Sequence, residues 1–311
     1  MARPRTVPPD HKPFAALPVQ MVTVGPGREQ MAVHVSGSLL PERMAVVCVA
    51  GYQRNMSDYT DFLRLYRQLM GEAAPVVLLD LKGRGRSSDR AQREHYSTLR
   101  DADDVSELMR ALGIGRATFV GQGHGGQVLM ALAALRPSVI AGTVLIDAGP
   151  VQDSRGLVRL RTTLDDLEGV RSEAGLRTML RRMLAADYPG LPENTLDALA
   201  MRTHYVDRRH RAQRLFDAGL VRLLDTFDFN DVLVAQWPLF DALTSAPLLM
   251  MRTQLTQQLR RETFDEMMKR RRDSEAFIIE SQGSPALLDT IEDVQPISEF
   301  VRQVVSGKKA A

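Results

Sequence analysis

Residues 117–133 read Ala-Thr-Phe-Val-Gly-Gln-Gly-His-Gly-Gly-Gln-Val-Leu-Met-Ala-Leu-Ala: a short apolar run, a glycine-rich turn and a second apolar run in direct succession. The β-branched and aromatic residues of 117–120 favour a buried strand. The run 127–133 contains no glycine or proline, and its residues favour a helix. This stretch therefore predicts a strand that passes straight into a helix, with Gly123 at the middle of the turn between them.

The composition limits what kind of protein the chain can form. Its 311 residues, 44% hydrophobic and 25% charged, are enough for one α/β domain with a sizeable insertion. The formal net charge is +2, and arginines are interspersed with acidic residues, which argues against nucleic acid as a partner. Cys48 lies in the apolar run 45–49, so we expect it in the core. We expect neither a metal site nor a cofactor.

The sequence also bears on where the protein is found. No stretch contains 18 consecutive apolar residues, and residues 1–18 have no apolar signal-peptide segment. We therefore expect a cytoplasmic protein that does not interact with a membrane. The oligomeric state leaves no signal in the sequence.

Apolar periodicity predicts an α/β fold. Two alternating runs, 19–24 and 31–35, flank Gly25-Pro26-Gly27 and indicate a β-hairpin. Further along, short β-branched runs alternate with amphipathic helical patterns, which is typical of a parallel sheet with crossover helices. The further strands are expected at 45–49, 75–79, 118–120, 142–146, 247–251 and 276–279. The helices are expected at 59–70, 99–112, 126–135, 261–271 and 294–305. Together these segments predict a mostly parallel, eight-stranded sheet flanked by helices.

The alternation of strands and helices stops between 151 and 237. Only helical patterns appear there, and the stretch is too long for a loop. We therefore predict a helical cap at 151–237, inserted into a core domain formed by 19–150 and 238–311. Residues 1–18 are rich in proline and charge and are expected to form a flexible N-terminal arm.

The order of several segments resembles the α/β-hydrolase superfamily, in particular the capped bacterial hydrolases that include esterases, lactonases, epoxide hydrolases and dehalogenases. The segments are Ala-Gly-Tyr-Gln-Arg-Asn at 50–55, Asp-Leu-Lys-Gly-Arg-Gly-Arg-Ser at 80–87, the turn at 120–126, Leu-Ile-Asp-Ala-Gly-Pro at 145–150 and Trp-Pro-Leu-Phe at 237–240. The resemblance covers residues 19–305, and it implies an α/β-hydrolase fold with an inserted cap.

The resemblance also implies where a catalytic triad would lie, and the chain departs from the family pattern at each place. Gly123 stands where the G-x-S-x-G motif has its nucleophilic serine. Gln257 lies nearest to the position of the acid after the seventh strand, and Ser284 takes the position of the histidine after the eighth. The last histidine, His210, falls inside the expected cap. We therefore predict a degenerate triad and no conventional Ser-His-Asp hydrolysis.

Two residues could supply an unconventional mechanism instead. Asp147 follows the sixth strand, where some dehalogenase-like relatives keep their acid, although a strand-end aspartate more often caps local backbone. His124 follows Gly123 directly and could act as a base, although the family uses the backbone N–H of that residue in the oxyanion hole. A hydrolase that activates water through these two residues is the second hypothesis.

The remaining oxyanion pocket is the other candidate site. The backbone N–H groups of Tyr52 and His124, with the helix that starts near Gly125, would converge on one point. Gly51 and Arg54 lie on the adjoining loop. We expect this pocket to bind a small molecule, with anions among the candidates.

One motif in this region has a different standard meaning. Gly121, Gly123 and Gly126 fit the G-x-G-x-x-G fingerprint of dinucleotide-binding proteins, and Asp147 lies about 20 residues further along. Such fingerprints normally open the first βαβ unit of a domain, whereas here a hairpin, two strands and two helices precede it. We therefore do not expect a nicotinamide cofactor.

The sequence thus predicts a catalytically degenerate, α/β-hydrolase-like protein, a pseudoenzyme that binds a small molecule or a protein partner. A hydrolase of small esters or lactones that uses Asp147 and His124 is one alternative. A structural or regulatory interaction protein with a closed pocket is the other. An open apolar cavity below the cap would favour ligand binding, and a filled one would favour the interaction protein.

Overall fold

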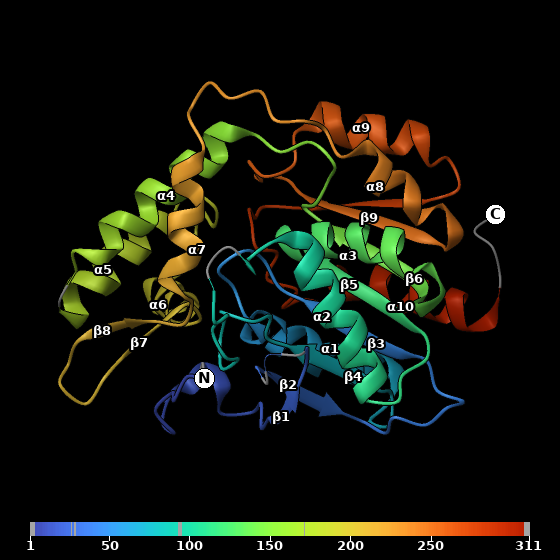
Figure 1. Ribbon diagram of the computed structural model, residues 1–311, viewed down its shortest axis with the longest axis horizontal. Helices are drawn as coiled ribbons and strands as arrows, with labels where there is room; N and C mark the ends of the chain where they lie inside the picture. The colour runs from blue at the N-terminus through green and yellow to red at the C-terminus, as the bar shows by residue number, and fades with distance from the viewer. Residues whose placement is uncertain (1–3, 26, 28, 93–94, 171, 308–311) are drawn as a thin grey trace.

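An eight-stranded sheet forms the centre of the fold, with the strand order β1-β2-β4-β3-β5-β6-β9-β10 (Figure 1). The computed structural model describes residues 4–307 except 26, 28, 93, 94 and 171. The strands are β1 (Gln20–Thr23), β2 (Gln30–Ser36), β3 (Ala45–Val49), β4 (Val76–Leu79), β5 (Ala117–Gln122), β6 (Ile140–Ile146), β9 (Leu248–Thr253) and β10 (Glu275–Ile279). β2 pairs antiparallel with β1 and β4, and all other neighbours are parallel. The predicted fold class is confirmed.

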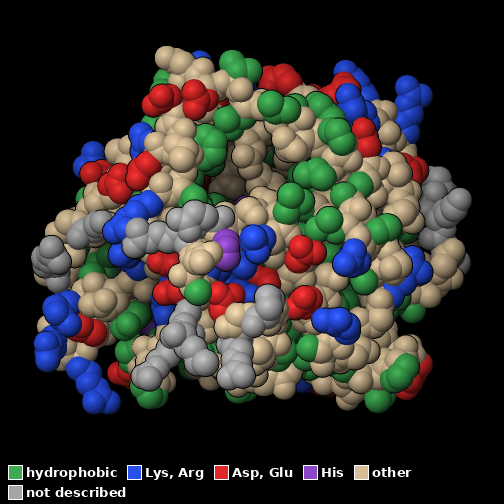
Figure 2. Space-filling view, viewed as in Figure 1, with side chains coloured by type: hydrophobic (Ala, Val, Ile, Leu, Met, Phe, Trp, Pro, Cys, Tyr) green, Lys and Arg blue, Asp and Glu red, His purple; other side chains and the backbone are tan. Residues whose placement is uncertain are grey.

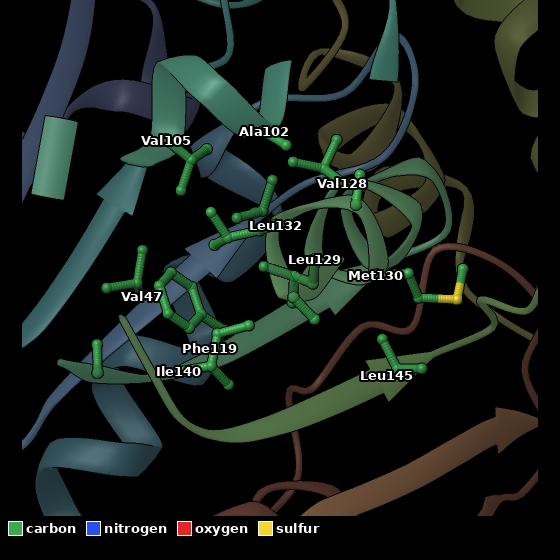
Figure 3. Close-up of a cluster of buried hydrophobic side chains, with 14 of the residues drawn as sticks. Val47, Ala102, Val105, Phe119, Val128, Leu129, Met130, Leu132, Ile140 and Leu145 are labelled. Carbon is green, nitrogen blue, oxygen red and sulfur yellow. The ribbon is translucent and has the colours of Figure 1, made fainter. Parts of the chain in front are cut away.

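Helices cover both faces of this sheet. They are α1 (Thr60–Met70), α2 (Thr98–Ala111), α3 (His124–Leu135), α8 (Trp237–Asp241), α9 (Arg261–Arg270) and α10 (Ile291–Ser306). α2, α3, α8 and α9 pack on one face, and α1 and α10 on the other. Figure 3 shows part of the first layer, in which Val105 of α2, Leu132 of α3 and Phe119 of β5 belong to one cluster of buried side chains. All five residues of β3 are buried, because each face of a parallel sheet is covered.

The segment 151–237, called the cap segment below, differs in part from the expectation. It contains α4 (Ser154–Glu168), α5 (Glu173–Leu184), α6 (Glu193–Ala200) and α7 (Ala218–Leu223). It also contains an antiparallel hairpin of β7 (His204–Val206) and β8 (Ala212–Arg214), so the prediction that it is entirely helical is wrong. Each of these strands has three residues, too few for a period of two to be visible in the sequence. In Figure 1 the cap segment lies beside the core.

The N-terminal segment is also different from the prediction. The described part, residues 4–18, packs against the core, whereas the sequence predicts a loose arm there. Phe14 and Leu17 are buried in the same core cluster as α1. The Arg86 guanidinium lies 4.1 Å from the centre of the Phe14 ring and donates a hydrogen bond of 2.8 Å to the Leu17 carbonyl. Two apolar side chains are enough to anchor a segment whose composition is otherwise typical of a loose arm. Residues 1–3 lie outside the described residues.

The predicted strands and helices of the core lie where they were expected, with ends shifted by a few residues. The β1–β2 hairpin is present, although Pro26 of its expected turn lies outside the described residues. β5 continues to Gln122, and α3 begins at His124 instead of Gly126. Among the described residues, no helix is both long and apolar enough to cross a bilayer.

Candidate functional site

The turn between β5 and α3 has the strained geometry of a nucleophile elbow, without a nucleophile. Gly123 has φ +51° and ψ −116°, a conformation that residues with a Cβ rarely adopt. A Cβ placed on Gly123 would lie 2.7 Å from Gln258 Oε1. Gly125 allows the turn to pack against the core, because a Cβ there would lie 2.1 Å from the Val49 carbonyl oxygen. The backbone therefore still presents position 123 as an elbow would.

Gly123 opens onto a cavity of about 710 Å³ between the core and the cap segment. Figure 2 shows this face of the molecule hollowed between the two. Apolar side chains of the cap segment line one side, among them Leu157, Leu160, Leu184, Leu220 and Phe227. Polar residues of the core line the other, among them Gln122, His124, Asp147 and Ser284. An open cavity favours ligand binding over the third alternative, an interaction protein with a closed pocket.

Ser284 and Asp147 are in direct contact. Ser284 Oγ donates a hydrogen bond of 2.5 Å to Asp147 Oδ2, and Thr256 Oγ1 lies 2.7 Å from Ser284 Oγ. The carboxylate also accepts bonds from Thr253, at 2.8 Å from the backbone N–H and 2.6 Å from the hydroxyl. Asp147, the acid after β6, therefore contacts Ser284, the residue at the family's histidine position. Within the described residues, the hydrogen bonds that the Asp147 carboxylate accepts come from hydroxyl and amide groups.

The surroundings of Asp147 shift its acidity. Burial raises the pKa of Asp147, and the hydrogen bonds from Ser284 and Thr253 oppose this only in part. No cation forms an ion pair with Asp147 among residues the structure describes. A carboxylate in this position is held by neutral donors.

His124 contacts two polar side chains at the cavity wall. Its Nε2 lies 3.1 Å from Asp101 Oδ2, and its Nδ1 lies 3.3 Å from Gln127 Oε1. Burial works against ionisation of Asp101, but the charge of Arg84 and the hydrogen bond from His124 outweigh it and lower the Asp101 pKa. Both nitrogens of the His124 ring are thus engaged, and neither contacts Asp147.

Two backbone donors at the cavity remain available. No described residue accepts a hydrogen bond from the backbone N–H of Tyr52 or His124. Both residues line the cavity, and their rings pack edge to face with centres 5.4 Å apart. The Tyr52 hydroxyl is used elsewhere, in a 2.9 Å bond to the Leu220 carbonyl of α7. These amides can bind an oxygen atom of a ligand.

Arg54 lines the cavity, but its charge is already neutralised. Its Nε donates a 2.7 Å bond to Asp58 Oδ2, and its Nη2 contacts the other oxygen of the same carboxylate. Only 10% of the side chain is exposed. A bidentate pair of this kind leaves little attraction for a further anion.

The other predicted positions are placed as follows. Gly51 lines the cavity beside Arg54. Gln257 reaches the cavity edge as an exposed residue and contacts neither Asp147 nor Ser284, so the acid position is better assigned to Asp147. Gly125 does not line the cavity. Among the described residues, no group of three or more His, Cys, Asp or Glu side chains could hold a metal ion.

The sequence matches the alpha/beta hydrolase family over residues 46–301. The chain belongs to this family. It is 26% identical over 187 residues to Esterase Rv0045c of Mycobacterium tuberculosis, a match of 59% of this chain and 59% of the esterase. It is 31% identical over 124 residues to the 3-hydroxybutyrate-oligomer hydrolase of Cupriavidus necator, a match of 40% of this chain and 41% of that protein. Each match thus spans less than two thirds of the relative.

A solved alpha/beta hydrolase from Novosphingobium aromaticivorans resembles the whole structure. It superposes with a TM-score of 0.80 at 25% identity and covers 92% of this chain and 98% of its own. Gly121, Gly123 and Gly126, which fit the dinucleotide fingerprint, lie at the turn that this family forms between β5 and α3. β5 is an inner strand of the sheet, and the Asp147 carboxylate accepts hydrogen bonds from Thr253 and Ser284.

Two further cavity residues of this alpha/beta hydrolase were not predicted from the sequence. Asp187 and His204 both lie in the cap segment and line the cavity. Burial, followed by the charge of Asp147, raises the pKa of Asp187 to about 6. Burial lowers the pKa of His204 to about 4. Neither residue belongs to a family motif, and its proximity to the elbow depends on how the cap segment folds back.

Proposed function

We propose that this protein binds a small, mostly apolar molecule with a carbonyl oxygen and does not hydrolyse it through a Ser-His-Asp triad. The observation that carries the proposal is the elbow itself: Gly123 keeps the backbone conformation of a nucleophile position and faces an open cavity of about 710 Å³. A cavity of this size and lining is typical of small-molecule sites.

Hydrolysis through a triad needs a nucleophile, a base and an orienting acid. Gly123 has no attacking atom. The base is also missing, because Ser284 stands beside Asp147 where a histidine would accept the proton. His124, which follows the elbow, has both ring nitrogens engaged by Asp101 and Gln127. The same scaffold can still hold an ester without cleaving it.

The lining indicates the kind of ligand. Leucine and methionine side chains of the cap segment favour an alkyl or aromatic part. The amides of Tyr52 and His124 favour an oxygen acceptor. The expectation of an anion came from these amides and the helix N-terminus. Because Arg54 on the adjoining loop is paired with Asp58, its charge adds little attraction for an anion, which favours a neutral carbonyl instead. The esterase among the relatives supports an ester as the group to test first.

The test compares binding with turnover on matched compounds. Methyl octanoate should raise the melting temperature in a saturable way and give a measurable Kd by calorimetry. p-Nitrophenyl octanoate should be cleaved no faster than by heat-denatured protein. Saturable cleavage would overturn the absence of catalysis, and methyl octanoate without any thermal or calorimetric signal would overturn the binding role.

A second candidate function has one observation in its favour, the 2.5 Å contact between Ser284 Oγ and Asp147 Oδ2. A carboxylate of raised pKa is a better base, and it could activate Ser284 or a water molecule. In this case p-nitrophenyl octanoate would be cleaved, and Asp147→Asn would abolish the activity. Ser284→Ala would abolish it where Ser284 is the nucleophile and leave part of it where water is. Activity that survives Asp147→Asn would rule this mechanism out.

A further inference from the structure

Asp187 is an acidic residue on the cavity wall that no part of the triad argument uses. It follows α5, lines the cavity and is partly exposed. Its carboxylate forms no hydrogen bond and no ion pair with any residue that the structure describes. Within the described part of the chain, its oxygens are not among the buried side-chain atoms that lack a partner. The carboxylate therefore keeps accessible surface, and a ligand in the cavity can reach it.

The turn after β10 fixes Asp187 beside the positions of the triad. The Asp187 carbonyl accepts a hydrogen bond of 2.5 Å from the Gly283 N–H. A Cβ placed on Gly283 would lie 2.4 Å from Asp187 Oδ1, so the carboxylate itself lies against this turn. Ser284, the next residue of the turn, donates its hydroxyl proton to Asp147. Asp187 therefore lies next to the pair that Ser284 and Asp147 form.

The same pair adjoins the elbow on its other side. Ile146, which precedes Asp147 in the chain, accepts a 2.9 Å hydrogen bond from the Gly123 N–H. His124 follows Gly123, and its backbone N–H is one of the two donors proposed to bind the ligand carbonyl. Asp187 and the elbow thus border the same part of the cavity, on either side of Asp147 and Ser284.

The charged side chains of the lining leave this part of the cavity negative. Arg159 of α4 has no ion pair among the described residues, but it is exposed, so solvent screens its charge. The carboxylates of Asp147 and Asp187 face the cavity without a cation in contact. The other charged residues of the lining form ion pairs, which are Arg54 with Asp58, Arg84 with Asp101 and Asp153 with Arg260.

Asp187 is poorly compensated in the free protein. Burial, followed by the charge of Asp147, raises the pKa of Asp187 to about 6. Tyr188, beside it in the chain, stays neutral because burial raises its pKa. A cation against Asp187 would offset the repulsion from Asp147 and replace the hydration that burial removes. The free cavity therefore favours a positively charged group at this point.

We propose that Asp187 selects ligands that carry a protonated amine close to the carbonyl bound at the Tyr52 and His124 amides. The ligand class is thus an amino-substituted carbonyl compound with an apolar tail. This inference rests on the proposed binding function and adds a specificity residue to it. Hydrogen bonds between an ammonium group and a carboxylate are about twice as strong as those between neutral groups, so an amine is preferred over a hydroxyl.

The test uses methyl octanoate, its 2-amino and 3-amino derivatives, and the matching 2-hydroxy and 3-hydroxy esters as neutral controls. At pH 7 the wild-type protein should bind at least one amino ester about tenfold more tightly than methyl octanoate and than its hydroxy counterpart, by calorimetry. Asp187→Asn, which keeps the shape of the side chain and removes its charge, should bring both ratios to about one. Asp165→Asn, at an exposed position of α4 outside the cavity lining, should keep the wild-type ratios.

The pH dependence gives a readout that a merely structural role of Asp187 would not produce. In the free protein Asp187 ionises as the pH rises through about 6, so the affinity for the preferred amino ester should increase between pH 5 and pH 7. At pH 6 binding should release protons, because the ammonium group lowers the pKa of Asp187. Calorimetry in two buffers of different ionisation enthalpy measures this release, and both effects should be absent from Asp187→Asn.

The outcomes separate this inference from the function on which it rests. Binding of methyl octanoate with equal affinity for all four derivatives would overturn the role of Asp187 and leave the binding function standing. No binding of any of the five esters would overturn the binding function. A preference for an amino ester that persists in Asp187→Asn would assign the selectivity to another residue and overturn this proposal. Tighter binding of the hydroxy esters than of the amino esters would overturn it as well.

Discussion

Gly123 combines the backbone geometry of a nucleophile elbow with a residue that has no side chain. Its φ of +51° is easy for glycine and strained for any residue with a Cβ. An active elbow must tolerate that strain, because the strain exposes the nucleophile. In this chain the backbone conformation is retained at no such cost.

Gly123→Ser tests this interpretation directly. We expect the free energy of unfolding to fall by about 1–3 kcal/mol, because the serine must adopt the strained backbone conformation. Gln258 Oε1, 2.7 Å from the new Cβ, belongs to an exposed side chain that can move aside, so backbone strain should dominate the loss. Denaturant unfolding measures the change.

The same variant should gain no esterase activity, because no histidine stands at the Ser284 position to accept the serine proton. Gly123→Ala is the matched control and should lose the same stability. A burst of p-nitrophenol from Gly123→Ser, or a variant more stable than wild type, would contradict the interpretation.

At the scale of elements, the turn between β10 and α10 joins the core to the cap segment. Gly283 N–H donates to the Asp187 carbonyl at 2.5 Å, and the Tyr188 hydroxyl donates to the Pro285 carbonyl. Gly283 is required here, since a Cβ would collide with the Asp187 side chain. The turn therefore places the Asp187 side chain beside Gly283 and within electrostatic reach of Asp147.

This contact predicts a pH-dependent effect of Asp187→Asn. Burial and then Asp147 raise the Asp187 pKa to about 6, above the value of 3.8 expected for an unperturbed aspartate. The ionised form is therefore unfavourable in the folded state above pH 6, and this penalty disappears as the pH falls through 6 towards 3.8. Asp187→Asn should melt a few degrees higher than wild type at pH 7.5 and at the same temperature below pH 4.

Thermal melts across this pH range provide the measurement. Asp165→Asn, at an exposed position of α4, is the control and should follow the wild-type curve. A gain in stability that grows towards acidic pH would have the wrong sign and would exclude the proposed repulsion.

At the scale of the whole molecule, the cavity lies between the cap segment and the core. The cap segment contributes an apolar wall, and the core contributes the polar wall that faces it. Leu160 of α4 lies on the apolar side and is partly exposed to the cavity. Filling the cavity should block ligands without unfolding the protein.

Leu160→Trp should weaken methyl octanoate binding about tenfold or more, with a melting temperature of the free protein close to that of wild type. Met268→Trp, on the outer surface of α9, adds the same side chain away from the cavity and should bind as wild type does. Undiminished affinity in Leu160→Trp, measured by calorimetry, would show that the ligand binds elsewhere.

The sequence by itself determined the fold and placed a glycine, Gly123, at the elbow position. Alternating short apolar runs and amphipathic helices are local patterns, and each reports the environment of its own segment. The same holds for the glycine turn at 121–126, whose residues are neighbours in the chain. Local patterns of this kind therefore locate the core strands, the core helices and the elbow to within a few residues.

Only the tertiary structure decided which polar groups meet. Asp147 and Ser284 are 137 residues apart, and their contact depends on the packing of β6 beside β9 and β10. The sequence placed Arg54 on the loop beside the oxyanion pocket, and only the structure showed that it pairs with Asp58. His204 lines the cavity only because the cap segment folds back over the core. Residue type states what a side chain can do, whereas its partners follow from contacts distant in sequence, which no local pattern encodes.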